Sequence, residues 1–101
     1  MLYCILGEDR QDSLEARRQN RPAHLERLQR LQDQGRLVLA GPLPSIDCED
    51  PGPAGFQGSV IIAEFASLQE AEQWAAQDPY HHGGVYSRTT VRPFKQVFPS
   101  Q

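Results

Sequence analysis

His24 and Asp78 are the two residues of this 101-residue chain whose types could move a proton together. An imidazole accepts or donates a proton near neutral pH, and a carboxylate can fix its tautomer and stabilise its charged form. The two lie more than fifty residues apart, each beside an expected helix end. Asp78 belongs to the tripeptide Asp78-Pro79-Tyr80, in which the proline fixes the turn that presents the carboxylate. The sequence therefore predicts a His/Asp pair for general acid–base chemistry, provided that the fold brings them together.

The expected helix positions bear on the charge of both groups. Pro22 fits a first helical turn, which places His24 in the same turn, where the positive end of the helix dipole disfavours an imidazolium. We therefore expect a neutral imidazole that can accept a proton. Asp78 is expected just past the end of the second helix, where the dipole disfavours a carboxylate, so Asp78 needs a partner.

Each residue also has an ordinary structural interpretation. A single histidine on a helix is usually a packing or surface residue, and an aspartate before a proline is a common N-cap of the following turn. His81 and His82 raise a third possibility, a metal centre formed with His24 and Asp78. Adjacent histidines point in different directions, however, and no recognised metal-ligand spacing is present. We expect neither a metal nor another cofactor.

Candidate substrate-binding groups are weaker in the sequence. The cluster Arg17, Arg18 and Arg21 is typical of a solvated face, although it could steer a small anionic substrate. Serines and tyrosines in strands more often pack than bind, and Tyr80 is expected to pack rather than react. The candidates for substrate contacts are Arg21, Ser59, Tyr80, His82 and Tyr86.

Composition limits the classes of function. The net charge of -3 argues against nucleic-acid binding, which usually needs a basic face. No apolar run approaches the ~20 residues of a membrane helix, and the apolar start lacks the basic region and cleavage site of a signal peptide. Cys4 and Cys48 match no metal or redox spacing and indicate free thiols in a reducing compartment. We expect a cytoplasmic protein that binds a small molecule, without a nucleic-acid or membrane partner.

Secondary structure follows from apolar runs and their punctuation. Strands are predicted over residues 2–7, 36–41, 58–66 and 85–92. One helix is expected from Pro22 to a stop at Gly35, and a second begins at the capping box formed by Ser67 and Glu70. Residues 8–20 are polar and charged and could hold a short helical turn after Asp12 or Ser13, either of which is a fair N-cap. Residues 42–57 form a long loop rich in proline and glycine, of a kind that is often functional.

The resulting order is βαββαβ. It predicts an α+β, ferredoxin-like fold, a four-stranded antiparallel sheet with two helices on one face. Residues 1–98 would form this single domain and residues 99–101 a C-terminal tail. Strands containing Val38-Leu39 and Val60-Ile61-Ile62 would leave the other face apolar, so we expect a homodimer through that open face, with a higher oligomer also possible.

Five segments together resemble the YciI family, from Leu2 to Phe98. They are RPAHLERLQRLQDQGRLVLAGPLP, the loop DPGPAGFQGS, the strand VIIAEF, the helix end WAAQDPY and the strand GVYSRTTVRPFKQVF. The family is similar in fold to muconolactone isomerase and other dimeric α+β barrels. The resemblance implies that the histidine of R-P-x-H, here His24, and the aspartate of D-P-[YF], here Asp78, form a catalytic centre in a pocket.

The resemblance also implies a reaction class. A related dehydrochlorinase that acts on a chlorinated hydroxyquinol implies proton transfer and elimination on a small cyclic compound. We expect a cofactor-free isomerase or lyase in which His24 and Asp78 carry out isomerisation, elimination or lactone rearrangement. The alternative is a non-catalytic ligand-binding or accessory module in which the pair stabilises helix ends or binds a small anion. His81 and His82 depart from the small or apolar residues expected of relatives there.

Overall fold

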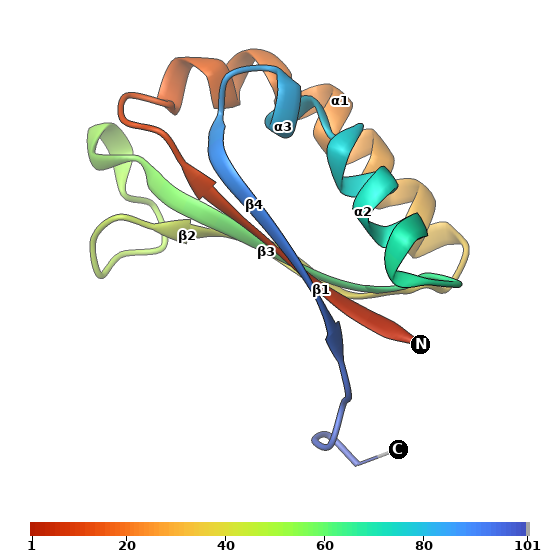
Figure 1. Ribbon diagram of the computed structural model, residues 1–101. Coiled ribbons are helices and arrows are strands. Elements are labelled where there is room, and N and C mark those ends of the chain that lie inside the picture. Colours follow the sequence, from red (N-terminus) through yellow and green to blue (C-terminus); the bar gives the residue numbers. More distant parts are fainter. Residues whose placement is uncertain (101) are drawn as a thin grey trace.

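The structure is a computed structural model that describes residues 1–100. Its centre is a four-stranded antiparallel sheet in the order β2-β3-β1-β4, as Figure 1 shows. The strands are β1 (Leu2–Asp9), β2 (Leu37–Pro44), β3 (Phe56–Glu64) and β4 (Tyr86–Phe94). The helices are α1 (Leu14–Asp33), α2 (Leu68–Ala76), the short α3 (Pro79–His82) and a 3₁₀ turn, η1 (Gly52–Ala54). Within residues 1–100, no helix has the length and apolar character needed to cross a membrane.

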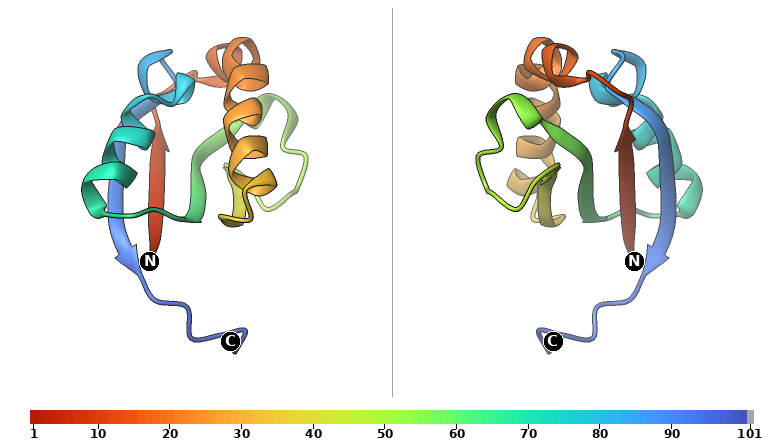
Figure 2. Two further views of the ribbon diagram at one scale, coloured as in Figure 1. Left: turned by 90° about the vertical axis from the view of Figure 1, so that its right-hand side faces the viewer. Right: turned by 90° about the vertical axis from the view of Figure 1, so that its left-hand side faces the viewer.

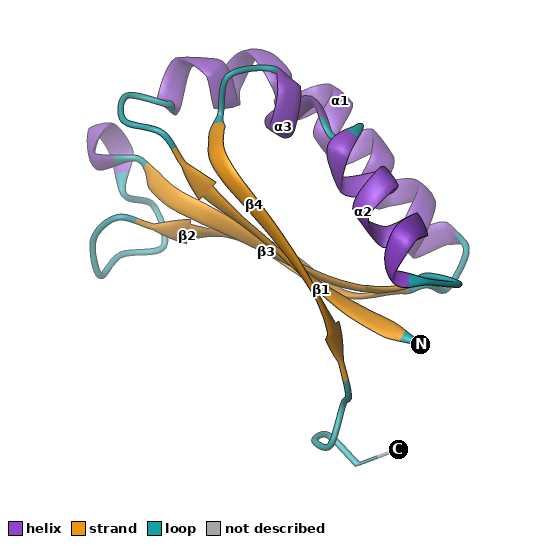
Figure 3. Ribbon diagram, viewed as in Figure 1, coloured by secondary structure: helices purple, strands orange, loops and turns teal. Residues whose placement is uncertain are grey.

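All three α-helices lie on one face of the sheet (Figures 2 and 3). The predicted α+β, ferredoxin-like arrangement is therefore confirmed. Strand alternation explains the core, because Ile5 pairs with Ile61 and Tyr3 with Ala63, and all four face the helices. The other residues of this core are Leu31 of α1, Ala71 and Ala75 of α2, and Phe65.

Helix α1 is longer than the sequence predicts, because it begins at Leu14 and not at Pro22. Pro22 lies inside the helix, where it cannot donate to the carbonyl of Arg18. Both residues are exposed, so water can satisfy that carbonyl and the helix continues. His24 consequently lies in the middle of a 20-residue helix. The expectation that it sits in the first turn, under the influence of the helix dipole, is wrong.

The segment expected as a long loop contains more regular secondary structure than predicted. Strand β2 extends to Pro44 and β3 begins at Phe56, with η1 between them, so the irregular connection is shorter than residues 42–57. The hydrogen bond from the Glu70 amide to Ser67 Oγ, which a capping box predicts, is present at 3.1 Å. Beyond α2, Asp78 is the N-cap of α3, whose first residue is Pro79.

The sheet face opposite the helices is uncovered within residues 1–100 (Figure 2). Register places Leu6 with Val60, and Leu39 with Ile62, on this outer face. Leu39 is 50% exposed. The chain after β4 runs away from the sheet (Figure 1). The division into a domain of residues 1–98 and a tail of 99–101 stays a prediction, and residue 101 lies outside the described residues.

Candidate active site

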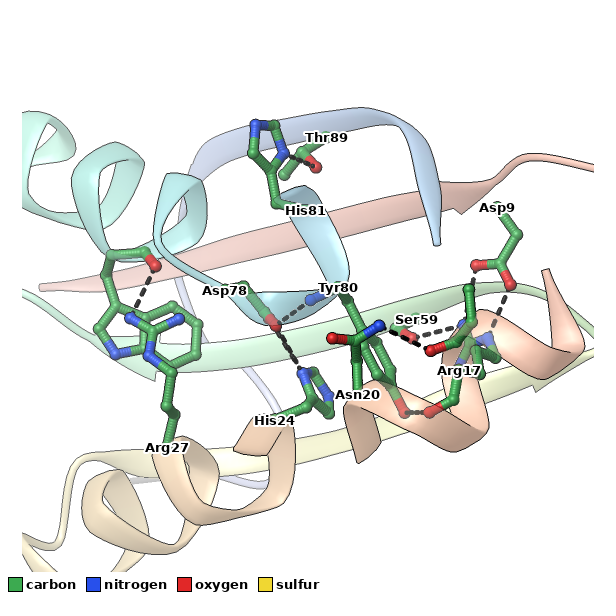
Figure 4. A network of polar contacts seen from close by, with 12 residues as sticks. Asp9, Arg17, Asn20, His24, Arg27, Ser59, Asp78, Tyr80, His81 and Thr89 are labelled. Carbon is green, nitrogen blue, oxygen red and sulfur yellow. Dashed lines mark hydrogen bonds and ion pairs between the residues drawn. The ribbon is translucent and has the colours of Figure 1, made fainter. Parts of the chain in front are cut away.

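His24 and Asp78 lie in contact, although 54 residues separate them in sequence. The His24 Nδ1 atom is 2.8 Å from Asp78 Oδ1 and 3.0 Å from Oδ2. Helix α1 carries the histidine, and the α2–α3 junction carries the aspartate (Figure 4). Both residues are buried, with 6% and 3% of their surface exposed. The fold thus forms the pair for which the sequence supplied the two residue types.

Asp78 has a second partner that places it firmly. Its Oδ1 accepts from the backbone amide of Tyr80 at 2.9 Å, so Asp78 is the N-cap of α3. Pro79 occupies the first position of that helix, where its missing N–H costs nothing. The N-cap interpretation of Asp78 is therefore confirmed, and the same carboxylate also contacts His24. It is not a carboxylate stranded beyond the end of α2, as the sequence suggested.

The pairing fixes which imidazole nitrogen is free. An ionised carboxylate only accepts hydrogen bonds, so we assign the proton of the neutral ring to Nδ1, which donates to Asp78. Nε2 then carries a lone pair, and it has no hydrogen-bond partner within residues 1–100. His24 also lines a cavity of about 870 Å³. The arrangement can hold a neutral imidazole with its basic nitrogen toward a bound molecule.

The cavity lies between α1 and strands β2 and β3, with η1 at one side. Its lining is mainly apolar, from Leu14, Leu25, Leu28, Pro42, Pro53, Phe56 and Ile61. Arg18 and Arg21 are exposed residues of its lining. Arg18 is paired with Glu15, whereas Arg21 makes no ion pair with any of residues 1–100. The cavity is therefore an apolar space whose lining includes one arginine, Arg21, that makes no ion pair with any of residues 1–100.

Tyr80 forms the wall beside His24. Its ring stacks on the imidazole with centroids 3.8 Å apart and planes 4° apart. The guanidinium carbon of Arg17 lies 5.1 Å from the centroid of the same ring. Burial raises the pKa of the Tyr80 phenol, and the charges of Arg17 and Arg21 oppose this only in part. Tyr80 therefore remains protonated and holds the imidazole ring in one plane.

The candidate substrate-binding residues divide into two groups. Arg21, Ser59 and Tyr80 line the cavity together with His24, whereas His82 and Tyr86 do not. His82 is exposed on α3. Tyr86 is buried edge-on against Tyr80, with ring centroids 5.8 Å apart, and burial raises the pKa of its phenol. Residues 1–100 contain no group of three or more histidine, cysteine, aspartate or glutamate side chains that could hold a metal ion.

Gly7 makes room for the ring of Tyr86. A Cβ atom at residue 7 would lie 2.4 Å from Tyr86 Cζ, whereas a Cβ at Gly41 would meet no atom within 4 Å. We expect Gly7→Ala to lower the free energy of unfolding by about 1–3 kcal/mol, because the buried ring must move. Gly41→Ala, the matched control in another strand, should change it by less than about 0.5 kcal/mol. Urea denaturation measures both, and equal values would show that Tyr86 is not wedged against β1.

Sequence reasoning missed the role of Arg17. It is not part of a solvated face, because only 6% of it is exposed. Its Nε and Nη2 atoms donate to the two carboxylate oxygens of Asp9 at 2.6 and 2.8 Å. Burial opposes the charge of Arg17, but the Asp9 carboxylate outweighs it and raises the pKa of the guanidinium. Asp9 and Arg17 are eight residues apart, and this spacing alone does not predict a contact. The pair could be predicted only with the knowledge that α1 begins before Arg17.

Arg27 is a second residue that the sequence did not single out. Its Nη2 donates to the carbonyl of Trp74 at 2.8 Å, and its guanidinium carbon lies 4.2 Å from the Trp74 ring centroid. Burial lowers the pKa of Arg27, and the nearby Asp78 carboxylate opposes this. Arg27 thus attaches the last turn of α2 to α1, close to the point where Asp78 meets His24.

A ferredoxin-like α+β domain with a buried His/Asp pair at an apolar cavity is the class that the fold and the site define. Residues 1–95 match the YCII-related domain family. The chain is 58% identical to protein YciI of Escherichia coli O6:H1 and 52% identical to a protein of Haemophilus influenzae. Each comparison covers 97% of this chain and 100% of the relative. The chain belongs to the YCII-related family, as the resemblance implied.

A solved structure is also similar over the full length. It is 5-chloro-2-hydroxyhydroquinone dehydrochlorinase (TftG) from Burkholderia phenoliruptrix AC1100, in complex with 2,5-dihydroxybenzoquinone. The TM-score is 0.83 at 27% sequence identity, and the comparison covers 100% of both chains. The fold of this chain is therefore also the fold of an enzyme that binds a small cyclic compound.

Proposed function

We propose that this protein is a small enzyme that catalyses proton transfer, with His24 as the proton acceptor and Asp78 as the group that orients it. One observation carries the proposal: Nδ1 of His24 lies 2.8 Å from Asp78, while the ring lines the cavity and Nε2 has no partner within residues 1–100. A carboxylate on Nδ1 stabilises the imidazolium that forms when Nε2 accepts a proton. The site needs no cofactor for this step.

The reaction class follows from the site and the structural relative. A base beside an apolar cavity can remove a proton from a carbon or hydroxyl group of a small ring, which begins an elimination, an isomerisation or a lactone rearrangement. The dehydrochlorinase of similar fold supports elimination. Arg21 at the cavity supports an acidic substrate.

The free thiols Cys4 and Cys48 support the expected cytoplasmic location.

The compound in the name of the structural relative is the first substrate to test. We expect the purified protein to release chloride from 5-chloro-2-hydroxyhydroquinone, or to exchange ring protons of related cyclic acids for deuterium. An ion-selective electrode measures chloride release under anaerobic conditions, and proton NMR in deuterated water measures exchange. Rates equal to those in buffer, together with saturable binding, would favour the alternative of a ligand-binding module.

That alternative has one observation in its favour. Asp78 caps α3 and also binds His24, so the pair would join α1 to α3 even without any reaction. A binding module would keep its affinity for small acids when His24 is replaced, and it would show no turnover to lose. Binding and turnover must therefore be measured on the same variants.

A second copy of the chain is the partner that we propose for the open sheet face. Its apolar residues include Leu39, which is 50% exposed and stands opposite Ile62. A monomer would leave this face in water, and a two-fold dimer would bury it. We expect Leu39→Glu to convert a dimer into a monomer, as measured by light scattering after size exclusion. Leu68→Glu, on the helical side, should leave the dimer unchanged; a wild-type monomer would contradict the proposal.

A further inference from the structure

The Nη1 atom of Arg17 takes part in none of the hydrogen bonds that join this guanidinium to Asp9, Gly58 and Ser59, which use Nε and Nη2. Arg17 is 94% buried, since 6% is exposed, and it lines the cavity. The guanidinium also lies beside the phenol of Tyr80, whose pKa it lowers against the larger effect of burial. The one fully buried side-chain nitrogen or oxygen without a partner in this range belongs to Arg27. Nη1 of Arg17 is therefore not a fully buried, unpartnered atom, and the cavity is the space that the Arg17 side chain lines.

Ser59 provides a second donor beside it. Its Oγ accepts from Arg17 Nη2 at 2.9 Å, so its hydroxyl proton can be donated to another acceptor. The buried phenol of Tyr86 is one such neighbour, because the hydrogen bond of Ser59 lowers the pKa of that phenol against the larger effect of burial. Ser59 is 4% exposed and lines the same cavity. The carboxylate of Asp9, which balances the charge of Arg17, does not line the cavity, and the lining residue Glu15 is paired with Arg18. The two donors thus face a mainly apolar space, where hydrogen bonds to an anion are strong.

The ring of Tyr80 contacts both His24 and Arg17. Its ring centroid lies 3.8 Å from the His24 ring centroid and 5.1 Å from Arg17 Cζ. His24 and Arg17 also stand two helical turns apart on α1. His24 and Arg17 therefore both lie against this ring, and both line the same cavity.

We propose that Arg17 Nη1 and Ser59 Oγ form an oxyanion-binding subsite, which selects small ring compounds bearing an ionised carboxylate, phenolate or enolate oxygen. This inference rests on the proposed function for the position of the reacting group near His24. The unpaired Arg21 adds positive charge on the cavity lining and attracts the same class of molecule. Arg17 and Ser59 bind and orient the ring, and His24 reacts with it.

Benzoate and benzamide test the subsite without turnover, because they share a shape and differ in charge. Isothermal titration should show that the wild type binds benzoate at least about tenfold more tightly than benzamide, since hydrogen bonds to charged groups are the stronger ones. Ser59→Ala should weaken benzoate at least about fivefold and weaken benzamide by less, because the neutral amide oxygen is the poorer acceptor. Arg30→Gln is the control for the loss of one positive charge, because Arg30 is exposed and does not line the cavity. It should leave the affinities for benzoate and benzamide unchanged.

Amide NMR shifts then locate the bound anion. Benzoate should perturb the amides of Gly58 and Ser59 in the wild type. Equal affinities for the two probes, no saturable benzoate binding, perturbation confined to the surroundings of Arg21, or an unchanged Ser59→Ala would each overturn the subsite. Arg17→Lys serves as a second variant where it folds, and should also lose the preference for benzoate.

The two proposals fail separately. His24→Asn should keep the preference for benzoate, because it leaves Arg17 and Ser59 in place. A preference for benzoate in a protein whose turnover does not depend on His24 would preserve the subsite and reject the proposed base. Turnover that depends on His24 in a protein without that preference would do the reverse.

Discussion

His24→Asn lowers turnover by about 10²–10⁴-fold, the usual contribution of a positioned general base. Asparagine is the informative replacement, because its amide nitrogen can donate to Asp78 in place of Nδ1, while no atom replaces Nε2. The variant should fold with the same secondary structure, as measured by circular dichroism. Turnover of the substrate identified by chloride release or deuterium exchange provides the readout.

Because asparagine at residue 24 can still donate to Asp78, the effect of His24→Asn on turnover can be interpreted separately from the loss of that contact. A loss of turnover in His24→Asn with unchanged benzoate affinity assigns the effect to the missing proton acceptor. A variant that keeps full turnover would show that His24 is a packing residue between α1 and Tyr80, and the proposed mechanism would be wrong.

Asp78→Asn is expected to lower turnover by up to about 10⁴-fold, through the tautomer of His24. Its amide group can turn its N–H₂ toward Nδ1, and the imidazole must then carry its proton on Nε2, the atom that should accept one. Stability should change by less than about 1 kcal/mol, because asparagine is as good an N-cap as aspartate and its oxygen can still accept from the Tyr80 amide.

Asp78→Ala is the comparison that separates stability from catalysis. It leaves both the His24 Nδ1–H and the Tyr80 amide without their acceptor, so we expect it to lower the free energy of unfolding by about 1–3 kcal/mol. Thermal stability of this variant alone does not separate a structural Asp78 from a catalytic one, since one carboxylate has both contacts. Normal turnover in a folded Asp78→Asn protein would exclude the orienting role.

The fold was predictable because its signals are local. Ser67 begins α2 through a capping contact with Glu70, and alternating apolar residues place Ile5 and Ile61 on the helix-facing side of the sheet. The sequence indicated a helical turn after Asp12 or Ser13, and Ser13 is the N-cap of α1, but it did not indicate that this turn continues into the helix that contains Pro22. Pro22 normally marks a helix start, and only the exposure of the preceding turn allows the helix to run through it.

The site shows the same division. The residue types and the Asp78-Pro79 turn could be found in the sequence, but the role of Arg17 could not, because its partners Asp9, Gly58 and Ser59 come from three segments that meet only in the folded sheet. Tyr86 illustrates the opposite error. A strand tyrosine near the site suggested a substrate contact, yet the absence of a side chain at Gly7 gives its ring a place to pack.

The tautomer of His24 tests the central claim most directly and needs no substrate. Long-range nitrogen–proton correlation spectra of histidine-labelled protein distinguish a protonated Nδ1 from a protonated Nε2. In the neutral ring we predict that Nδ1 carries the proton, bonded to Asp78, and that Nε2 is unprotonated; in Asp78→Asn the assignment should reverse. A wild-type His24 with its proton on Nε2 would contradict the account, because the nitrogen at the cavity could not then accept a proton.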